Sequence, residues 1–372
     1  MTTVSRCTAV LVFSIFCVVA ASAQTPEKGA TQNVIFVMTD GLRWQEVFRG
    51  AEDSLIKKKY KVKDESALRK AYWRDTPEAR REALMPFLWS TIAKQGQIYG
   101  NRDKGSDAYV TNKFFFSYPG YSETLCGFAD PRVNSNNKVP NPNVTVLEWL
   151  NGKAPYRGKV AAFAAWDVLA SAFNVERAGF PVIAAFDPLT TLPDNPRVDL
   201  LNHMKVETPR YWDDEPFDNV AFYTAVEYVK ERKPRVLYIS LGETDDWAHE
   251  HNYAYYLDAA HRVDEYLRVL WETVQAMPEY RGKTTLIFSP DHGRGNGRKW
   301  SEHGSEAPVS KYIWMAFLGP DTPALGERSS VPAVTQNQIA ATLATFLGED
   351  YNADVPKAGK PIADALRHSA RE

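Results

Sequence analysis

Short apolar runs alternate with segments of helical periodicity, and this alternation restricts the possible folds more than any other feature of the chain. The apolar runs are rich in β-branched residues, as buried strands are, and they cover residues 33–39, 159–166, 235–241, 284–289 and 314–318. Helical patterns cover residues 144–150, 219–230, 252–277 and 336–347. Strands that alternate with helices predict a three-layer α/β fold, in which helices cover both faces of a largely parallel central sheet.

Two stretches interrupt this alternation. Residues 49–85 are rich in charged side chains and contain no apolar strand, so we expect a surface insertion that is partly helical. Residues 185–218 are rich in Pro, Asp and Asn, which predicts an ordered but irregular excursion that forms a small cap over the site. We expect a single catalytic domain over residues 24–372 that carries both insertions.

The first 23 residues have the three parts of a secretory signal peptide. Arg6 precedes an apolar run over residues 9–20, and Ala-Ser-Ala stands before Gln24. The run is too short to cross a bilayer core of roughly 30 Å as a helix. We therefore expect cleavage after Ala23, a periplasmic or secreted protein, and no stable membrane insertion afterwards. A retained N-terminal anchor is the alternative.

Composition narrows the possible partners. With 44% hydrophobic and 24% charged residues the chain is globular, and a formal net charge of −2 provides no basic field to capture nucleic acid. Without the signal peptide only Cys126 remains, so no internal disulfide can form. The expected partner is a small molecule. The sequence carries no signal for an oligomeric state.

Residues that can bind metal follow three of the predicted strands. In open α/β sheets ligands bind beyond the carboxyl ends of the strands, and at these positions the chain has Asp40, then Asp245 and His249, then Asp291, His292 and His303. Asp245 and His249 are four residues apart, so both side chains can face one ion across a helical turn. An isolated Asp after a strand is more often a cap or turn residue, but three such groups predict a metal centre.

A candidate nucleophile lies between the first and second of these groups. Pro119 suits the first turn of a helix, which places Ser117 directly before the helix N-terminus. The free N–H groups and the dipole of a helix N-terminus attract phosphate-like anions. An isolated Ser at such a position is usually only an N-cap, but the metal-binding groups favour a nucleophile.

These residues, in this order, resemble the alkaline phosphatase superfamily. The shared features are Asp40, Ser117 ten residues before Gly127, Asp-x-x-x-His, Asp-His-Gly, and a last His. Its nucleotide pyrophosphatase/phosphodiesterase branch is most similar, because Ser117-Tyr118-Pro119 presents a hydroxyl residue, an aromatic residue and Pro before the helix. The resemblance covers residues 33–348 apart from the two insertions, and it implies an alkaline-phosphatase-like fold.

The resemblance also implies a catalytic apparatus. One zinc ion would be held by Asp245, His249 and His303, and a second by Asp40, Asp291 and His292 together with the Ser117 oxygen. Two Zn²⁺ per chain are therefore expected, although Mn²⁺ also suits Asp and His ligands. The implied activity is hydrolysis of phosphoric esters through a phosphoseryl intermediate.

The substrate contacts are less determined. The superfamily holds a phosphate oxygen with an Asn about twenty residues after the nucleophile, and the candidates here are Asn134, Asn136 and Asn137. The branch usually has Asn three residues after the nucleophile, where this chain has Gly120. Candidate cations for the extra charge of a monoester are Lys113, Arg43, Arg157 and Lys159. Candidate aromatic contacts for the organic group of a diester are Trp44, Trp247 and Trp300.

The resemblance favours a phosphodiesterase, with a phosphomonoesterase as the alternative. A sulfatase needs a C-x-P-x-R type motif, and this segment has Tyr121 in place of the Arg. Gly120-Tyr-Ser122-Glu123 weakly resembles the nucleophile motif of a phosphomutase. A non-catalytic metal-binding protein is the remaining alternative. We interpret His203, His261 and His368 as structural or solvated, and expect His251 near the metal ligands.

Overall fold

The structure is a computed structural model that describes residues 29–367. The expected signal peptide, residues 1–23, and His368 lie outside the described residues. Within residues 29–367 no helix is long and apolar enough to cross a membrane.

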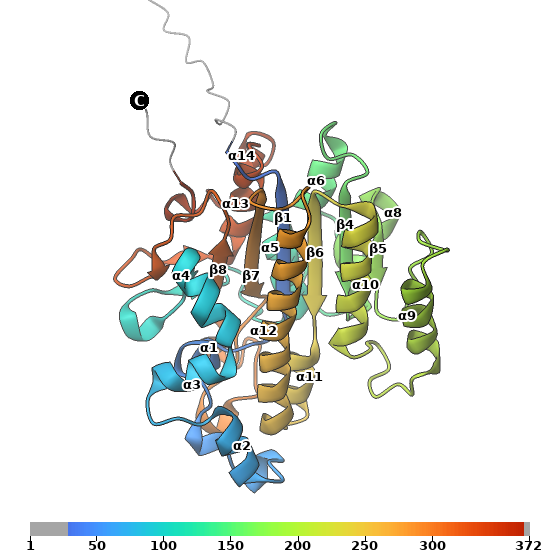
Figure 1. Cartoon of the computed structure of the whole chain (residues 1–372). Coiled ribbons are helices and arrows are strands. Elements are labelled where there is room, and N and C mark those ends of the chain that lie inside the picture. The colour runs from blue at the N-terminus through green and yellow to red at the C-terminus, as the bar shows by residue number, and fades with distance from the viewer. Residues whose placement is uncertain (1–28, 368–372) are drawn as a thin grey trace, which may run out of the picture.

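An eight-stranded sheet forms the middle layer, in the order β5-β4-β6-β1-β7-β8-β2-β9 (Figure 1). The strands are β1 (Asn33–Thr39), β2 (Gln97–Tyr99), β4 (Val160–Ala164), β5 (Val182–Ala184), β6 (Val236–Leu241), β7 (Thr284–Pro290), β8 (Met315–Leu318) and β9 (Gly326–Glu327). The five strands from β5 to β7 are parallel, and β8 runs antiparallel to both of its neighbours. A separate parallel pair joins β3 (Ala108–Tyr109) to β10 (Val334–Thr335).

Helices cover both faces of this sheet, as Figure 1 shows. Alternate side chains of β1 enter two different cores, with Ile35 and Val37 in one, and Val34 and Phe36 in the other. The first core is covered by α1 (Trp44–Arg49), α2 (Glu65–Tyr72), α3 (Pro77–Leu84), α10 (Asp218–Arg232) and α12 (Tyr253–Ala276). The second is covered by α5 (Ser117–Cys126), α6 (Val146–Gly152), α7 (Val168–Phe173), α8 (Val175–Ala178), α13 (Ile339–Phe346) and α14 (Tyr351–Asp354). The predicted α/β class and the largely parallel sheet are confirmed.

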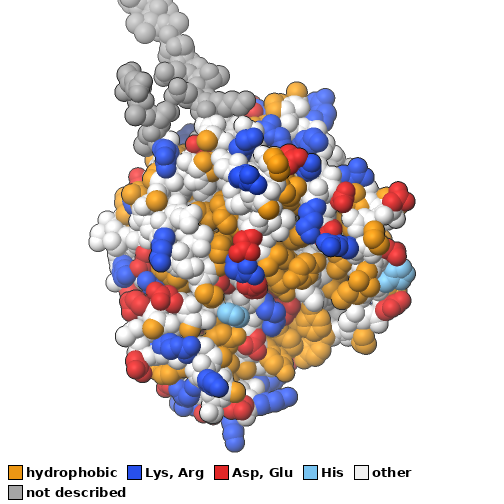
Figure 2. All heavy atoms as spheres, in the orientation of Figure 1, with side chains coloured by type: hydrophobic (Ala, Val, Ile, Leu, Met, Phe, Trp, Pro, Cys, Tyr) orange, Lys and Arg blue, Asp and Glu red, His pale blue; other side chains and the backbone are white. Residues whose placement is uncertain are grey.

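The helices α10 and α12 contact each other through aromatic rings. Phe222 and Tyr266 stack with centroids 4.4 Å apart. Figure 2 shows apolar side chains gathered on the face that these two helices present, where Tyr223 and Tyr255 remain partly exposed. The patch is the outer edge of the contact between the two helices.

The two stretches that interrupt the strand and helix pattern are more regular than the sequence predicts. Residues 49–85 contain α2 and α3, but Leu55, Ile56 and Leu84 are buried in the core, so the segment is not confined to the surface. Residues 185–218 contain the helix α9 (Pro196–Glu207), so the expectation of an irregular excursion is wrong for these twelve residues. Asn195 caps α9 by accepting hydrogen bonds from two backbone N–H groups, and Pro196 occupies its first turn.

Candidate active site

A cavity of about 270 Å³ opens at the carboxyl ends of β1, β4 and β6, where a doubly wound sheet binds its ligands. The segment 208–217 and the helix α11 (Glu243–His249) form part of its wall. The lining residues are Asp40, Ser117, Asn136, Trp166, Asp214, Glu215, Gly242, Asp245, Asp246, His249 and His303. The cavity therefore contains the predicted nucleophile and ligands from both predicted metal sites.

The first group of ligands is buried and consists of Asp40, Asp291 and His292. His292 donates from Nδ1 to the Gly293 carbonyl oxygen (2.8 Å), and its Nε2 lies 3.2 Å from Asp40 Oδ1 and 3.5 Å from Asp291 Oδ2. Burial disfavours the imidazolium, but the charges of Asp291 and Asp40 outweigh it and raise the pKa of His292 to about 9. The same negative field attracts a divalent cation.

Hydrogen bonds orient the Asp291 carboxylate so that one of its oxygens can bind a metal ion. Its Oδ1 accepts hydrogen bonds from the backbone N–H groups of Gly41 (3.0 Å) and His292 (2.8 Å). Its Oδ2 is buried and has no hydrogen-bond partner within the described part of the chain. A buried carboxylate oxygen without a partner is costly, and a metal ligand bond satisfies it.

The second group is Asp245, His249 and His303. Asp245 and His249 share one turn of α11, with Oδ2 and Nε2 2.9 Å apart, and His303 Nε2 lies 3.0 Å from His249 Nε2. Burial, together with the nearby charges of His292 and Arg294, lowers the pKa of His303. A neutral imidazole is the form that binds metal.

The two groups adjoin, because His292 Nε2 lies 3.7 Å from Asp245 Oδ1. Within each group the ligand atoms lie within 4.8 Å of one another, and no other such group of three occurs in residues 29–367. Carboxylate oxygens and imidazole nitrogens fit zinc, and they also fit manganese. The structure thus brings together all six predicted ligands in the two predicted sets.

Arg294 was not predicted, although it follows the Asp-His-Gly segment directly. Its buried guanidinium pairs with Asp245, and burial lowers its pKa to about 9. Gly41 admits this contact, since a Cβ there would lie 2.7 Å from Arg294 Nε, and its φ is +59°. We expected His251 near the metal ligands, and hydrogen bonds through Ser301 and Arg294 connect it to Asp245. His251 Nδ1 lies 2.8 Å from Ser301 Oγ, and the Ser301 carbonyl accepts from Arg294.

Ser117 is the first residue of α5, one position later than predicted, and is almost fully buried. Its Oγ lies 3.3 Å from His292 Nε2 and 3.5 Å from Asp40 Oδ1. Ser122, from the phosphomutase-like segment, lies one turn further on and accepts a hydrogen bond from Asn141 Nδ2 (3.1 Å) outside the cavity lining. Only Ser117 therefore combines a helix N-terminus with the metal-binding groups.

Of the three candidate asparagines, only Asn136 lines the cavity. Its side chain accepts a hydrogen bond from the Tyr118 backbone N–H (3.0 Å). The atom facing that donor must be Oδ1, so Nδ2 is left to donate to an anion. Asn134 instead donates to the Pro131 carbonyl (3.3 Å), and the Asn137 backbone donates to Ser135 Oγ.

The candidate cations lie elsewhere. Lys113 is exposed and does not line the cavity. Arg43 is buried in ion pairs with Glu46 and Glu52, so its charge is already compensated. Arg157 and Lys159 precede β4, which places them at the opposite end of the sheet from the cavity. As a result, the lining residues include no Lys and no Arg.

The cavity also has a different aromatic residue from those predicted. Trp44, Trp247 and Trp300 are all buried in one core and do not line the cavity. Trp166, which follows β4, does line it. Trp166 could have been predicted from the sequence, because it stands at the end of an apolar run, as several of the candidate ligands do.

Gly120 occupies the position where the branch usually has Asn. A Cβ at Gly120 would lie 2.5 Å from the Asp291 backbone oxygen, so α5 packs directly against the end of β7 at this point. A side chain at position 120 is therefore excluded by the packing.

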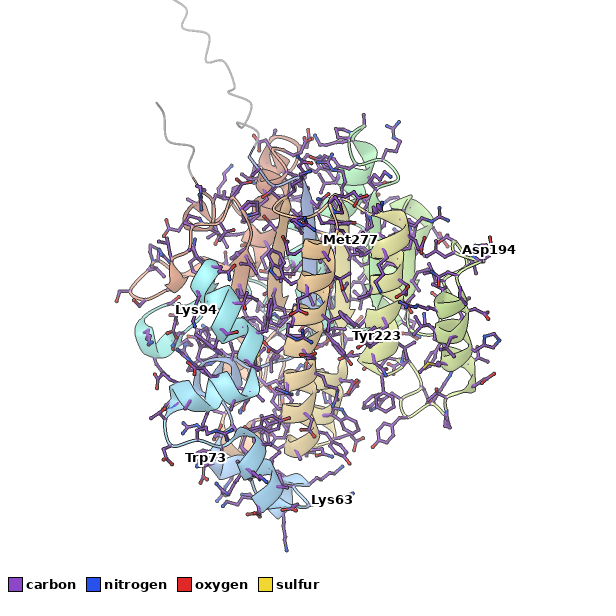
Figure 3. All side chains as sticks on the ribbon, in the orientation of Figure 1. Lys63, Trp73, Lys94, Asp194, Tyr223 and Met277 are labelled. Atoms are coloured by element: carbon purple, nitrogen blue, oxygen red, sulfur yellow. The ribbon has the colours of Figure 1, made fainter. Side chains whose placement is uncertain are left out.

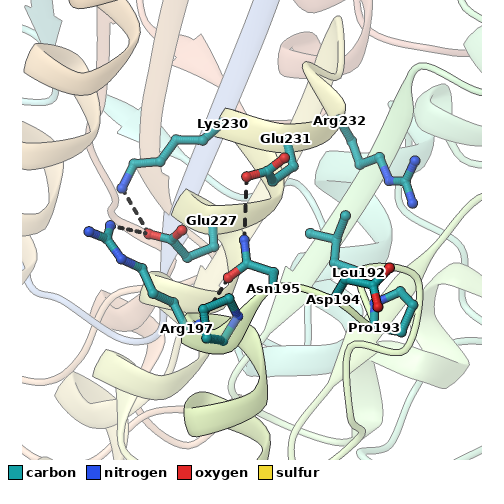
Figure 4. Close-up of a pocket in the computed structure, with 10 residues that line it drawn as sticks. Leu192, Pro193, Asp194, Asn195, Arg197, Glu227, Lys230, Glu231 and Arg232 are labelled. Carbon is teal, nitrogen blue, oxygen red and sulfur yellow. Dashed lines mark hydrogen bonds and ion pairs between the residues drawn. The ribbon is translucent and has the colours of Figure 1, made fainter.

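A larger groove of about 580 Å³ lies between α9 and α10, but its charged groups are satisfied by one another. Figure 4 shows Glu227 contacting Arg197 (3.3 Å) and Lys230 (2.8 Å), and Asn195 contacting Glu231. Asp194, in the loop before α9, lies at the edge of the molecule (Figure 3). The groove contains none of the predicted site residues.

No family model and no curated protein matches this sequence. Solved structures do share the fold. Wild-type alkaline phosphatase PafA aligns with a TM-score of 0.57 at 11% identity, over 91% of this chain and 99% of that chain. The lipoteichoic acid synthase LtaP from Listeria monocytogenes gives 0.56 at 12% identity, over 87% and 73%. BT1596, a 2-O GAG sulfatase, gives 0.56 at 13% identity, over 93% and 76%. The predicted alkaline-phosphatase-like fold is confirmed, and the match does not single out one branch.

Proposed function

We propose that this chain is a metal-dependent hydrolase of phosphoric esters, with diesters preferred, in which Ser117 is the nucleophile. The observation that carries the proposal is the position of Ser117 Oγ, at the N-terminus of α5 and within 3.5 Å of ligands from the Asp40, Asp291 and His292 group. The second group lines the same cavity. Of the branches of the superfamily, the Ser117-Tyr118-Pro119 segment is most similar to the nucleotide pyrophosphatases and phosphodiesterases.

Two divalent ions, which we propose to be zinc, would be held by the two groups of ligands. Bound there, they supply positive charge for the attacking and leaving oxygens and lower the pKa of the Ser117 hydroxyl. The protein supplies the geometry. Tyr121 donates its hydroxyl proton to Asp40 Oδ2 (3.0 Å) and in turn accepts from Ser240 (3.0 Å), which fixes the orientation of Asp40.

Ser117 Oγ gives up its proton and forms the new bond to phosphorus, and the bond to the leaving oxygen breaks with its electron pair passing to that oxygen, which takes up a proton in turn. Water then attacks the phosphoseryl group, and the Ser117 hydroxyl is restored. At the start of α5 the Tyr118 N–H is already bonded to Asn136 and Pro119 has no N–H, so the Ser117 backbone N–H and Asn136 Nδ2 are the groups that can donate to the non-bridging oxygens.

The absence of Lys and Arg from the lining supports a diester as the substrate. A monoester dianion carries one more charged oxygen, and sites selective for it place a cation there. The superfamily's sulfatases have the same fold, but the segment from Ser117 to Tyr121 lacks the motif that a sulfatase needs. The small volume of the cavity favours a small substrate.

Turnover of three nitrophenyl esters by one preparation tests the proposal. We expect kcat/KM for bis-nitrophenyl phosphate to exceed that for nitrophenyl phosphate, and nitrophenyl sulfate to be the poorest of the three. A hundredfold preference for the monoester would make the chain a phosphomonoesterase, and a preference for the sulfate would make it a sulfatase. Turnover of none of them by metal-loaded protein would favour a non-catalytic metal-binding protein.

A further inference from the structure

We infer that the organic group of the substrate carries a positive charge, held by a wall that consists of Trp166, Asp214 and Glu215. The inference rests on the proposed function and specifies its substrate class as a phosphodiester with a small organic ammonium group. The three residues line the same cavity as Ser117 and the metal-binding groups.

The wall has a negative charge that no neighbouring base neutralises. Among residues 29–367, neither Asp214 nor Glu215 forms an ion pair with Lys, Arg or His, and the lining contains no Lys or Arg. Three nearby basic side chains have other partners, and the first, Arg210, lies over the Phe186 ring at 3.9 Å from its centroid. Lys138 pairs with Asp167 (2.5 Å), and Arg294 pairs with Asp245. A cationic ligand would supply the missing charge.

Trp166 adds a surface that suits an ammonium group. Its Nε1–H donates to Asp214 Oδ2 (2.9 Å), so the indole and the carboxylate are fixed relative to each other. The backbone N–H of Asp167 also donates to the Asp214 carbonyl (3.2 Å), which ties the segment 208–217 to the end of β4. An indole face beside a carboxylate attracts a cation through both its quadrupole and the adjacent charge.

Glu215 provides an independent indication of a ligand. It is only 5% exposed, and its carboxylate forms no hydrogen bond or ion pair within the described part of the chain. It approaches Gly242 so closely that a Cβ at that position would collide with the carboxylate. This carboxylate lines the cavity without a partner from residues 29–367, and a cation in the cavity compensates its charge.

A third metal ion is not the occupant that the geometry favours. Asp214 and Glu215 belong to neither metal-binding group. Within residues 29–367 no group of three ligand atoms within 4.8 Å of one another includes either of them. Hard divalent ions need several oxygen ligands converging on one point. Two carboxylates with an indole bonded to one of them match a larger, polyatomic cation better.

A pair of substrates of nearly equal shape tests the inference. Both are nitrophenyl phosphodiesters, one with a 2-(trimethylammonio)ethyl group and the other with a 3,3-dimethylbutyl group, in which carbon replaces the charged nitrogen. We expect kcat/KM to favour the charged ester by roughly tenfold or more. The ratio should fall toward one in Glu215→Gln and in Asp214→Asn, and salt should reduce it in the wild type.

Glu231→Gln is the matched control, since this exposed carboxylate lies in the groove between α9 and α10 and not in the cavity. The control should keep the wild-type ratio. Equal kcat/KM values for both esters in the wild type would overturn the inference while leaving the proposed function intact. Failure to hydrolyse either ester would instead count against the proposed function. A ratio unchanged in both wall variants would show that the preference arises elsewhere, which also overturns the inference.

Discussion

The Nε2 atoms of His249 and His303 lie 3.0 Å apart, although 54 residues separate them in the chain. Two imidazole nitrogens facing each other at this distance cannot both carry a proton. Burial and neighbouring positive charge lower the pKa of His303, which keeps its ring neutral. With Asp245 Oδ2 2.9 Å from His249 Nε2, the arrangement has the spacing of ligands around one ion.

Metal content tests this arrangement. Protein purified without chelators should contain close to two metal ions per chain, and Asp245→Ala should lower that number by about one, because one of the two groups loses its carboxylate. Asp246→Asn is the control, since Asp246 lines the cavity but belongs to neither group. Elemental analysis gives the answer, and active wild-type enzyme with one metal ion or none would refute the two-ion arrangement.

Replacement of the nucleophile gives the most direct catalytic test. Ser117→Ala should reduce kcat by roughly three orders of magnitude or more, while folding and metal content stay near wild type. Ser122→Ala should have a much smaller effect, because Ser122 faces Asn141 outside the cavity. The opposite result for the two variants would assign the nucleophile to Ser122. Steady-state kinetics and circular dichroism suffice.

Substitution of Gly120 tests how closely α5 packs against the end of β7. Gly120→Ala should lower the free energy of unfolding by about 1–3 kcal/mol and also lower kcat, because a Cβ 2.5 Å from the Asp291 backbone oxygen forces α5 away from the ligands. Gly152→Ala is the control, since a Cβ there meets nothing within 4 Å. Urea unfolding of both variants measures the difference. A Gly120→Ala enzyme as stable and active as wild type would show that α5 packs more loosely.

Lys205 should make stability depend on pH. It is 3% exposed and donates to the Asp187 carbonyl (2.6 Å), and burial lowers its pKa from 10.5 to about 8. Between pH 8 and 10.5 the unfolded state therefore binds more protons than the folded state, so this group makes folding more favourable as pH rises. The contribution is up to about 3 kcal/mol, at about 1.4 kcal/mol per pKa unit.

Lys205→Met removes this dependence. As pH rises from 8 to 10, the unfolding free energy of the wild type should increase relative to that of the variant. Lys63→Met, at an exposed position near the lower end of the molecule (Figure 3), is the control and should show a smaller shift. A constant difference for Lys205→Met across this range would mean that the folded and unfolded states bind the same number of protons, so that burial does not lower the pKa of Lys205.

The strands that carry the site were predictable because they are buried on both faces. Runs such as residues 33–39 and 284–289 place consecutive apolar side chains on both faces, with polar residues only at their ends, and the residues after them mark the carboxyl edge of the sheet. The edge strands β5 and β9, and β2 beside β9, have three residues or fewer, and short segments leave no such pattern. The six candidate metal ligands could be predicted because they follow such buried strands.

The rest of the site depends on tertiary contacts. Asp214 and Glu215 lie in a segment without periodicity, and they reach the cavity because Trp212 packs on Trp247, with ring centroids 4.9 Å apart. Arg294 reaches Asp245 only because Gly41 leaves room. Neither contact leaves a mark in the local sequence. By contrast, Asn195 before Pro196 is a recognisable signal for the start of α9, but the many polar residues around it obscured that signal.

The place of β1 in the middle of the sheet has a consequence for how the chain folds. Val34 pairs with Val236 on one side and with Thr285 on the other, so the earliest strand to be synthesised has no neighbour until some two hundred further residues exist. Pairings this distant in sequence are slow to form and leave strand edges open meanwhile. Nascent chains that end before β6 therefore hold β1, a mainly apolar strand, without a partner, and chains that end before β7 still leave one of its edges open. Such chains depend on being kept apart until the C-terminal third of the protein arrives.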